Sequence, residues 1–282
     1  MAKFFTPDAK FQLELVRSET TTKRDEAGYR LSPALNQSYL KDVNAVSPSY
    51  AEYRRLNPEE TPALIFGSAL HTLVLEPNDF NKRYAMLPDC DRRTKEGKAL
   101  FEEFAIANAG KRVLKSTEVD SLIAMAKKSR PFFDEKKAKY ANHEVECSAT
   151  FVVIDGEFKG QEVVVKAQFD AVYVFEDKVI IKDLKSVADI TNVKGASFQN
   201  GWATQSAFYH DLAQFCYQKD TSFDYIAQSK SEPYDVREFG VSDEMFIKGR
   251  QSYSLAINKW LWWKANGQPD TDAFHGKETL NG

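Results

Sequence analysis

The sequence VVVKAQFDAVYVFEDKVIIKDLK, residues 163–185, decides the fold of this chain. It contains two runs rich in Val, Ile, Phe and Tyr, at 163–175 and 178–185, and only Glu176 and Asp177 lie between them. Strand-forming residues on both sides of a two-residue gap are typical of a β-hairpin. The sequence therefore predicts two neighbouring antiparallel strands.

The pairing within this hairpin would bring two acids and an amine together. A turn on the two intervening acids places Asp170 opposite Asp183 and Gln168 opposite Lys185, on one side of the sheet. A four-residue loop keeps this pairing, whereas a three-residue loop breaks it. Directly opposed carboxylates repel each other, and a bound Mg²⁺ or Mn²⁺ would remove that repulsion. The alternative is a structural hairpin whose acids merely face water.

Other periodic segments surround the hairpin. Apolar and polar residues alternate from about Glu144 to Phe151, which predicts a preceding strand. A helix over 202–215, a strand over 223–228 and a C-terminal helix over 243–265 are expected after it. We therefore predict the α/β (α+β) class, with a central mixed sheet flanked by helices and a sheet core at 141–230.

The N-terminal half has a different pattern. Residues 1–30 mix charge with Ser and Thr and are expected to form a poorly ordered lead-in, so we place a single domain at 31–282. Its part at 31–140 is expected to be helical. Thr61 and Pro62 predict the start of a buried helix over 63–75, and further helices are expected after Thr94 and Ser116.

Charge is distributed unevenly along the 282 residues. The formal net charge is −3, but residues 82–139 hold 15 Lys plus Arg and 9 Asp plus Glu, so this segment is +6 and the remainder is −9. Contact with a polyanion is expected to involve the basic segment. With 43% hydrophobic residues and no apolar run of about 20 residues, the sequence indicates a folded cytoplasmic protein without a membrane span.

The cysteines and tryptophans are interpreted as structural. Cys90, Cys147 and Cys216 are far apart and form no CxxC pair, so we expect buried free thiols rather than a zinc or iron–sulfur site. Trp260, Trp262 and Trp263 lie in a helical stretch, where core or subunit-interface packing is expected rather than a ligand site.

A lysine beside a metal-bound carboxylate pair suits phosphodiester hydrolysis. Its amine can hold or help to deprotonate the attacking water and can neutralise charge that develops on phosphorus. A divalent cation would polarise the phosphoryl oxygen and acidify its bound water, so no serine or cysteine nucleophile is required. The predicted convergence of Asp170, Asp183 and Lys185 therefore indicates a metal-dependent nuclease.

The order of these motifs resembles the PD-(D/E)XK nuclease superfamily, and within it the exonuclease VIII or RecE-like branch. A carboxylate on one strand is followed by Asp-Leu-Lys-Ser on the next and by Gln205-xxx-Tyr209 on a helix. The upstream sequence GSALHTLVLEP, residues 67–77, is similar to the helix motif of that branch. The resemblance extends from about Leu31 to Phe215 and implies a restriction-endonuclease-like core with an N-terminal helical region.

Roles are implied for individual residues by this resemblance. The metal ligands would be His71, Asp170, Asp183 and the backbone carbonyl of Leu184. The catalytic set would be Asp170, Asp183, Lys185, Glu146, Gln205 and Tyr209, although Glu144 shares the strand face of Glu146 and could be confused with it. Gln168 departs from the branch, because related sequences often carry a basic residue there, and one expected phosphate contact is therefore in doubt.

The implied activity is a Mg²⁺-dependent exodeoxyribonuclease of a bacterial or phage-infected cell. It would degrade double-stranded DNA from 5′ ends and leave 3′ single-stranded tails for recombination. A ring-like homo-oligomer and a single-strand annealing protein as partner are implied in the same way. The alternatives are another endonuclease or single-strand repair nuclease of the superfamily, or a noncatalytic DNA-binding protein on the same fold.

Overall fold

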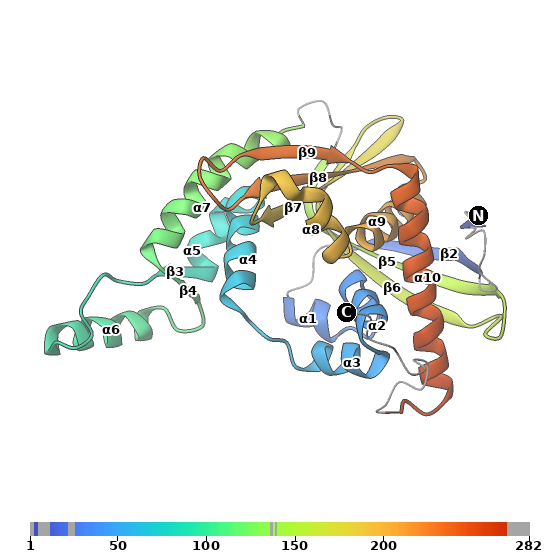
Figure 1. Cartoon of the computed structure of the whole chain (residues 1–282), viewed down its shortest axis with the longest axis horizontal. Coiled ribbons are helices and arrows are strands. Elements are labelled where there is room, and N and C mark those ends of the chain that lie inside the picture. Colours follow the sequence, from blue (N-terminus) through green and yellow to red (C-terminus); the bar gives the residue numbers. More distant parts are fainter. Residues whose placement is uncertain (1–2, 5–11, 22–25, 136–137, 139, 270–282) are drawn as a thin grey trace, which may run out of the picture.

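A seven-stranded mixed sheet forms the centre of the protein, with helices on both faces (Figure 1). The computed structural model describes residues 3–4, 12–21, 26–135, 138 and 140–269. The strand order is β1-β2-β5-β6-β7-β8-β9. The strands are β1 (Lys3–Phe4), β2 (Gln12–Thr21), β5 (Tyr140–Asp155), β6 (Glu162–Val174), β7 (Lys178–Val187), β8 (Asp220–Ser229) and β9 (Val236–Gly240). The predicted fold class is confirmed.

The register of the β6–β7 hairpin is the predicted one. Phe175 N donates to Lys178 O at 2.8 Å across the turn, and the pairing continues to Ala171 opposite Lys182. Beyond the hairpin, β8 joins β7 in parallel, because α8 (Val193–Gln199) and α9 (Trp202–Tyr217) carry the chain back across the sheet. The other strand pairs of this sheet are antiparallel, so the sheet is mixed.

Alternate residues of β7 pack into two separate cores. Val179 and Ile181 belong to the core that includes α9 and α10 (Asp243–Ala265), whereas Leu184 belongs to the core under α4 (Pro62–Leu75) and α7 (Ser116–Ser129). Leu184 is therefore turned into the opposite packing layer from its neighbours in sequence, as its parity predicts.

A buried ion pair fastens α9 to α10. The carboxylate of Asp211 is fully buried and accepts hydrogen bonds from Arg250 at 2.6 and 2.9 Å and from the Tyr253 hydroxyl at 2.8 Å. Gly249 permits the close approach of the two helices, because a Cβ there would lie 2.0 Å from the carbonyl oxygen of Ala203. These contacts fix α9 against the sheet.

The expectation of a poorly ordered lead-in is wrong for Gln12–Thr21. This segment forms β2, which pairs with β5 along most of its length. Leu13 and Leu15 are 1% and 0% exposed, and they alternate with half-buried or exposed neighbours, as in a strand with one buried face. Residues 1–2, 5–11 and 22–25 lie outside the described part of the chain.

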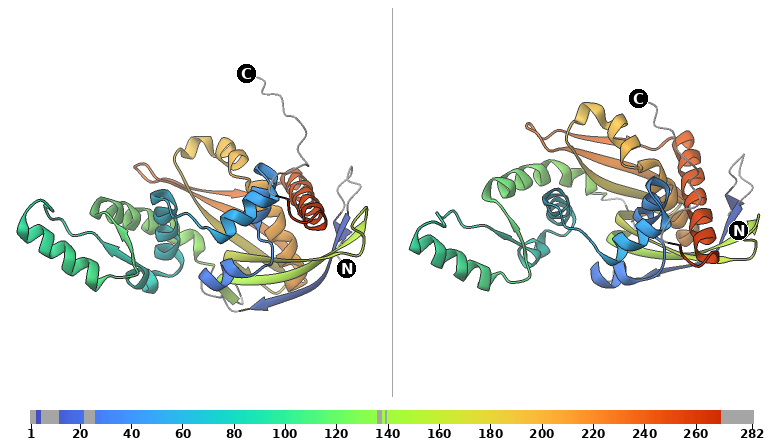
Figure 2. Two further views of the ribbon diagram at one scale, coloured as in Figure 1. Left: turned by 90° about the horizontal axis from the view of Figure 1, so that it is seen from below. Right: turned by 60° about the horizontal axis from the view of Figure 1, so that its bottom comes forward.

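The helical half agrees with the sequence. Thr61 caps α4 by accepting a hydrogen bond from Leu64 N, and Pro62 is the first helical residue. The helices expected after Thr94 and Ser116 are α6 and α7. This half contains α1 (Glu26–Leu31), α2 (Gln37–Ala45), α3 (Pro48–Leu56), α5 (Phe80–Arg83), α6 (Lys95–Ala107) and a small parallel sheet of β3 (Tyr84–Met86) with β4 (Arg112–Leu114). In both views of Figure 2, the segment around α6 extends away from the main sheet.

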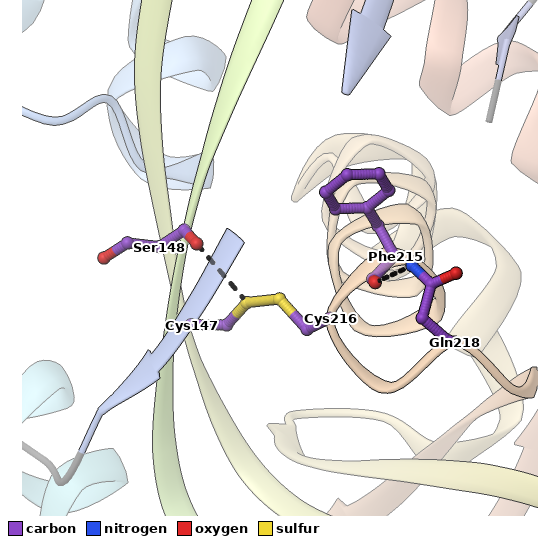
Figure 3. Close-up of a disulfide and its surroundings, with 5 residues drawn as sticks. All are labelled: Cys147, Ser148, Phe215, Cys216 and Gln218. Carbon is purple, nitrogen blue, oxygen red and sulfur yellow. Dashed lines mark hydrogen bonds between the residues drawn. A yellow bond between two sulfur atoms is a disulfide. The ribbon is translucent and has the colours of Figure 1, made fainter. Parts of the chain in front are cut away.

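Cys147 and Cys216 are not the free thiols that the sequence suggests. The two residues form a disulfide between β5 and the last turn of α9 (Figure 3). Their separation of 69 residues conceals this proximity, which follows only from the packing of α9 on the sheet. Cys90 is the free cysteine of the described residues.

The C-terminal helix has the predicted bounds, Asp243–Ala265. Trp263 is 5% exposed, and Trp260 and Trp262 pack against the core of α9 and α10, so the expected aromatic packing at this end is confirmed. Among the described residues, no helix combines the length and the apolar character that a membrane span requires.

Candidate active site

His71 and Asp170 form the first half of the site. The imidazole projects from α4 and its Nε2 lies 3.0 Å from Asp170 Oδ2 on β6. Its Nδ1 donates to the carbonyl oxygen of Gly67, one helical turn earlier, at 2.8 Å. Burial lowers the pKa of His71, but the charge and hydrogen bond of Asp170 outweigh burial and raise this pKa to about 9. In this arrangement His71 is an imidazolium at neutral pH.

Asp170 lies where the pairing of β6 with β7 ends. The last described backbone pair is Ala171 with Lys182, and the amide of Leu184, two residues further along β7, donates to Asp170 Oδ2 at 2.8 Å. A side-chain oxygen thus replaces a backbone acceptor. Burial raises the pKa of Asp170, yet the charge of His71 and its hydrogen bond dominate and lower it. Asp170 is held ionised.

Asp183 forms the second half of the site and is more deeply buried, with 3% of its side chain exposed. Gln205 of α9 donates from Nε2 to Asp183 Oδ2 at 2.6 Å. Oδ1 accepts no hydrogen bond of good geometry, although the Lys185 ammonium is in ion-pair contact with it. Burial, with a contribution from the charge of Asp170, raises the pKa of Asp183 to about 6 against the lowering effect of Lys185.

Tyr209 is next to this pair on α9. It lies one turn after Gln205, and the edge contact between its ring and Phe169 has a centroid distance of 5.2 Å. Burial raises the pKa of Tyr209 well above its usual value, and the nearby charge of Asp183 adds to this effect. The QxxxY spacing therefore brings both side chains to the same region, as predicted.

Two other predicted residues, Glu146 and Gln168, are described by their strand pairing. Glu146 is fully buried on β5, where it pairs with Gln168 of β6. The role implied for Glu146 near the metals stays a prediction. The backbone pairing described between β6 and β7 begins at Ala171, so it does not place Gln168 opposite Lys185. The residues that meet are His71, Asp170, Asp183, Lys185, Gln205 and Tyr209.

Comparison with known proteins identifies the family of this chain. Residues 38–272 match the model of a family described as a PDDEXK-like domain of unknown function. The chain belongs to this family. A crystal structure from Eubacterium rectale, described as that of a candidate exonuclease, is similar to the PDDEXK-like chain with a TM-score of 0.58 and 17% identity, over 88% of this chain and 89% of that one. The predicted PD-(D/E)XK superfamily is therefore confirmed, and the findings support a nuclease.

Two other comparisons add little to the PDDEXK-like assignment. The solved structure of SSO0001 aligns with 70% of this chain and 87% of its own at 12% identity, but its TM-score of 0.30 is too low to indicate a shared fold. No curated protein matches the chain.

The donor set of this PDDEXK-like site consists of carboxylate oxygens beside one imidazole. Within the described ranges, no three His, Cys, Asp or Glu side chains are grouped as a metal site requires, and each carboxylate of the site is paired with a cationic side chain. Nevertheless, carboxylate oxygens are the ligands that hard cations prefer. Asp183 Oδ1 is buried without a good hydrogen bond, and Asp170 is ionised. The chemistry of the residues fits a divalent cation.

Two contacts of the site were not predicted from the sequence. The carbonyl of Gly67 orients the His71 ring, and the four-residue spacing within the quoted helix motif could have indicated it. The Leu184 amide holds Asp170, whereas the sequence suggested only its carbonyl as a ligand. That amide contact depends on the end of strand pairing, for which the sequence carries no signal.

Proposed function

We propose that this protein is a divalent-metal-dependent exodeoxyribonuclease that degrades double-stranded DNA in the 5′-to-3′ direction. The observation that carries the proposal is the meeting of Asp170, Asp183 and Lys185 on two adjacent strands, beside His71 of α4. The family assignment supports a nuclease, and the exonuclease specificity and direction are taken from the resemblance. The partners expected from the sequence, a ring of identical chains and a single-strand annealing protein, stay predictions.

The cation would be Mg²⁺, with Mn²⁺ as an alternative. Asp170, Asp183, the Leu184 carbonyl and a deprotonated His71 are the groups that would hold it. When bound, such a cation polarises a phosphoryl oxygen and acidifies its water. Asp183 would gain most from a bound cation, because burial disfavours its ionised form and one of its oxygens lacks a good hydrogen bond.

The protein side chains then have separate tasks. Lys185 is 24% exposed and places its ammonium at the edge of the site, where it can orient a water molecule and neutralise negative charge on a phosphate. Gln205 fixes one oxygen of Asp183, so the other oxygen is directed towards Lys185. Tyr209 keeps its proton because its pKa is raised, and it can therefore donate to a phosphate oxygen.

A labelled-DNA digestion tests the proposal. Linear duplex labelled at the 5′ or the 3′ end is incubated with the full chain in Mg²⁺, Mn²⁺ or EDTA, and closed circular DNA is the control substrate. We expect metal-dependent release of the 5′ label as mononucleotides and an intact circle. Cutting of the circle would indicate an endonuclease instead. Unchanged activity in Asp183→Ala or Lys185→Ala would show that the site is assigned wrongly.

A further inference from the structure

An open pocket lies between α4, the first turns of α7 and the end of β8. Its volume is about 340 Å³, and the residues that line it are Phe66, Thr117, Glu118, Ser121 and Lys230. Small-ligand sites have volumes of roughly 300 to 1,000 Å³, so this pocket is at the lower end of that range. It is large enough for a group of the size of one nucleotide and too small for a base-paired duplex.

The α4 side of the pocket is joined directly to the active site. Phe66 precedes Gly67, whose carbonyl oxygen holds the imidazole of His71. The same glycine lies beside β7, because a Cβ built on it would be 4.0 Å from Ser186 Oγ. Ser186 follows Lys185 in the sequence. The Phe66 ring is therefore carried by the turn of α4 that touches the catalytic strand.

The other side of the pocket is joined to the end of that strand. Lys230 N donates to the carbonyl oxygen of Val187 at 2.9 Å, and Val187 is the last residue of β7. Only Ser186 separates Val187 from Lys185. The backbone thus places the Lys230 side chain close to where the catalytic strand ends.

The lining combines the chemical groups that recognise a nucleotide. The Phe66 ring is partly buried against the α4–α7 core and has no aromatic partner among the described residues. The ammonium of Lys230 has no ion-pair partner within the same part of the chain. An aromatic face can stack on a base, and a lysine can contact a phosphate.

Polar groups on α7 complete the lining. Glu118 Oε2 accepts a hydrogen bond from Lys115 N, which leaves its other oxygen available for a base amino group. The Ser121 hydroxyl is already engaged by the Thr117 carbonyl and the Tyr234 hydroxyl. The hydroxyl of Thr117 is on an exposed residue and can donate or accept.

We infer that this pocket binds one unpaired nucleotide of the DNA, with its base on Phe66 and its phosphate at Lys230. The inference rests on the proposed nuclease function and narrows its substrate. A base inside a duplex is stacked on both faces, and the pocket is too small to admit the end pair of a blunt duplex, so an unpaired or frayed base is the one that can reach the ring. The protein is therefore expected to prefer duplex ends that carry an unpaired nucleotide over blunt ends.

Binding is measured first, without turnover. Full-length protein in EDTA is titrated against a blunt hairpin duplex and against the same duplex with unpaired nucleotides at its end, one of which is 2-aminopurine. We expect the tailed duplex to bind about 5- to 150-fold more tightly, the range that stacking of one base supplies. The 2-aminopurine fluorescence is expected to fall on binding.

Matched variants isolate the ring. Phe66→Leu keeps apolar volume in the α4–α7 contact but removes the aromatic face, whereas Phe66→Trp retains it. Leu64→Ala, on the same helix and 53% exposed, is the control outside the pocket. We expect Phe66→Leu to lose the preference for the tail and the fluorescence change, and the other two variants to keep both. A Phe66→Leu protein that still prefers the tail as the wild type does would overturn the inference.

A second pair of variants tests the phosphate contact. Lys230→Gln is compared with Lys127→Gln, which removes an exposed lysine of α7 outside the pocket. We expect Lys230→Gln alone to weaken binding of the tailed duplex more than that of the blunt one, and to flatten its dependence on salt. Equal weakening by both variants would contradict the assigned role of Lys230.

The two proposals fail in different ways. If the wild type cleaves DNA in Mg²⁺ but Phe66→Leu retains the tail preference, the pocket assignment is wrong and the nuclease stands. If no DNA is cleaved in Mg²⁺ or Mn²⁺ but the tail preference depends on Phe66, the nucleotide site stands and the proposed nuclease function fails.

Discussion

Replacing Asp183 by Asn is expected to stabilise the metal-free protein while it abolishes cleavage. Burial raises the pKa of Asp183 from 3.8 to about 6, so at pH 7.5 the folded protein retains an ionised carboxylate that it disfavours. Each pKa unit corresponds to ~1.4 kcal/mol, so Asp183→Asn is expected to raise the free energy of unfolding by up to about 3 kcal/mol. With 3% of the side chain exposed, solvent screens little of this effect.

Asp170→Asn is the matched control, because this substitution is expected to destabilise the protein, whereas Asp183→Asn is expected to stabilise it. The pKa of Asp170 is lowered mainly by His71, so the folded state favours its ionised form. An asparagine there removes the charge that raises the pKa of His71, so the ion pair of the folded state is lost. The side chains of this pair are 27% and 21% exposed, so we expect a loss of roughly 1–3 kcal/mol, less than for a fully buried pair.

Urea denaturation in EDTA at pH 7.5 measures both variants. The difference between them decides the test, because a general effect of removing a negative charge would shift both in the same direction. Added Mg²⁺ is expected to stabilise the wild type and to leave Asp183→Asn nearly unchanged, since a ligand that binds only the folded state raises stability. If Asp183→Asn is less stable than the wild type in EDTA, the reasoning from burial is refuted.

Three further outcomes are expected. Because the folded pKa of His71, about 9, exceeds the unfolded value of 6.5, the His71–Asp170 pair contributes its full stability below pH 6.5 and loses it as the pH rises through 9. Urea denaturation in EDTA should therefore show that the free energy of unfolding falls by about 3 kcal/mol between pH 6.5 and pH 9. An equal fall in His71→Gln would show that another group causes it. Gly249→Ala is expected to lower the free energy of unfolding by roughly 1–3 kcal/mol. The added Cβ would meet Ala203 O at 2.0 Å and Ala207 Cβ at 2.5 Å, and neither atom is the end of a flexible side chain that could move away. Melts of the exposed Gln251→Ala provide the control, and equal stability of the two variants would show that α9 and α10 can separate without cost. Lys185→Ala is expected to lower kcat by at least about 100-fold with a small change in KM, because the lysine is expected to act in the transition state. Steady-state and single-turnover kinetics measure this effect. A change confined to KM would assign Lys185 to substrate binding instead.

The hairpin could be predicted because its information is local. A two-residue gap fixes the register, and the period of two then fixes which side chains share a face. Asp183 and Leu184 consequently occupy opposite layers, as expected. Helix starts such as Thr61-Pro62 are equally local, and α4 begins at the predicted place.

The errors concern partners that are distant in sequence. The segment Gln12–Thr21 has only two fully buried apolar residues, Leu13 and Leu15, and its partner strand β5 begins more than a hundred residues later. Without β5 there is no reason for this polar, threonine-rich segment to be extended. The bond between Cys147 and Cys216 depends in the same way on how α9 packs. Tertiary packing, rather than local propensity, decides both.

The sequence left open whether Asp170 and Asp183 form a metal-binding pair or merely face water, and the burial of the two side chains bears on that choice. If the acids merely faced water, both would be exposed and both would keep ordinary pKa values. Instead Asp183 is 3% exposed with its pKa raised, whereas Asp170 is partly exposed with its pKa lowered. Two like groups with opposite shifts differ in their surroundings, which is typical of functional acids.

The balance of charge explains how the fold tolerates this arrangement. Asp170 is matched by His71 and Asp183 by Lys185, so the two carboxylates do not face each other uncompensated. The match is incomplete at Asp183, where one buried oxygen lacks a good hydrogen bond and burial still outweighs the lysine. The fold therefore retains at Asp183 an unfavourable charge that a divalent cation would relieve. A purely structural hairpin would gain stability from a neutral residue here, so the Asp183→Asn measurement tests directly whether this charge serves the proposed catalysis rather than the fold.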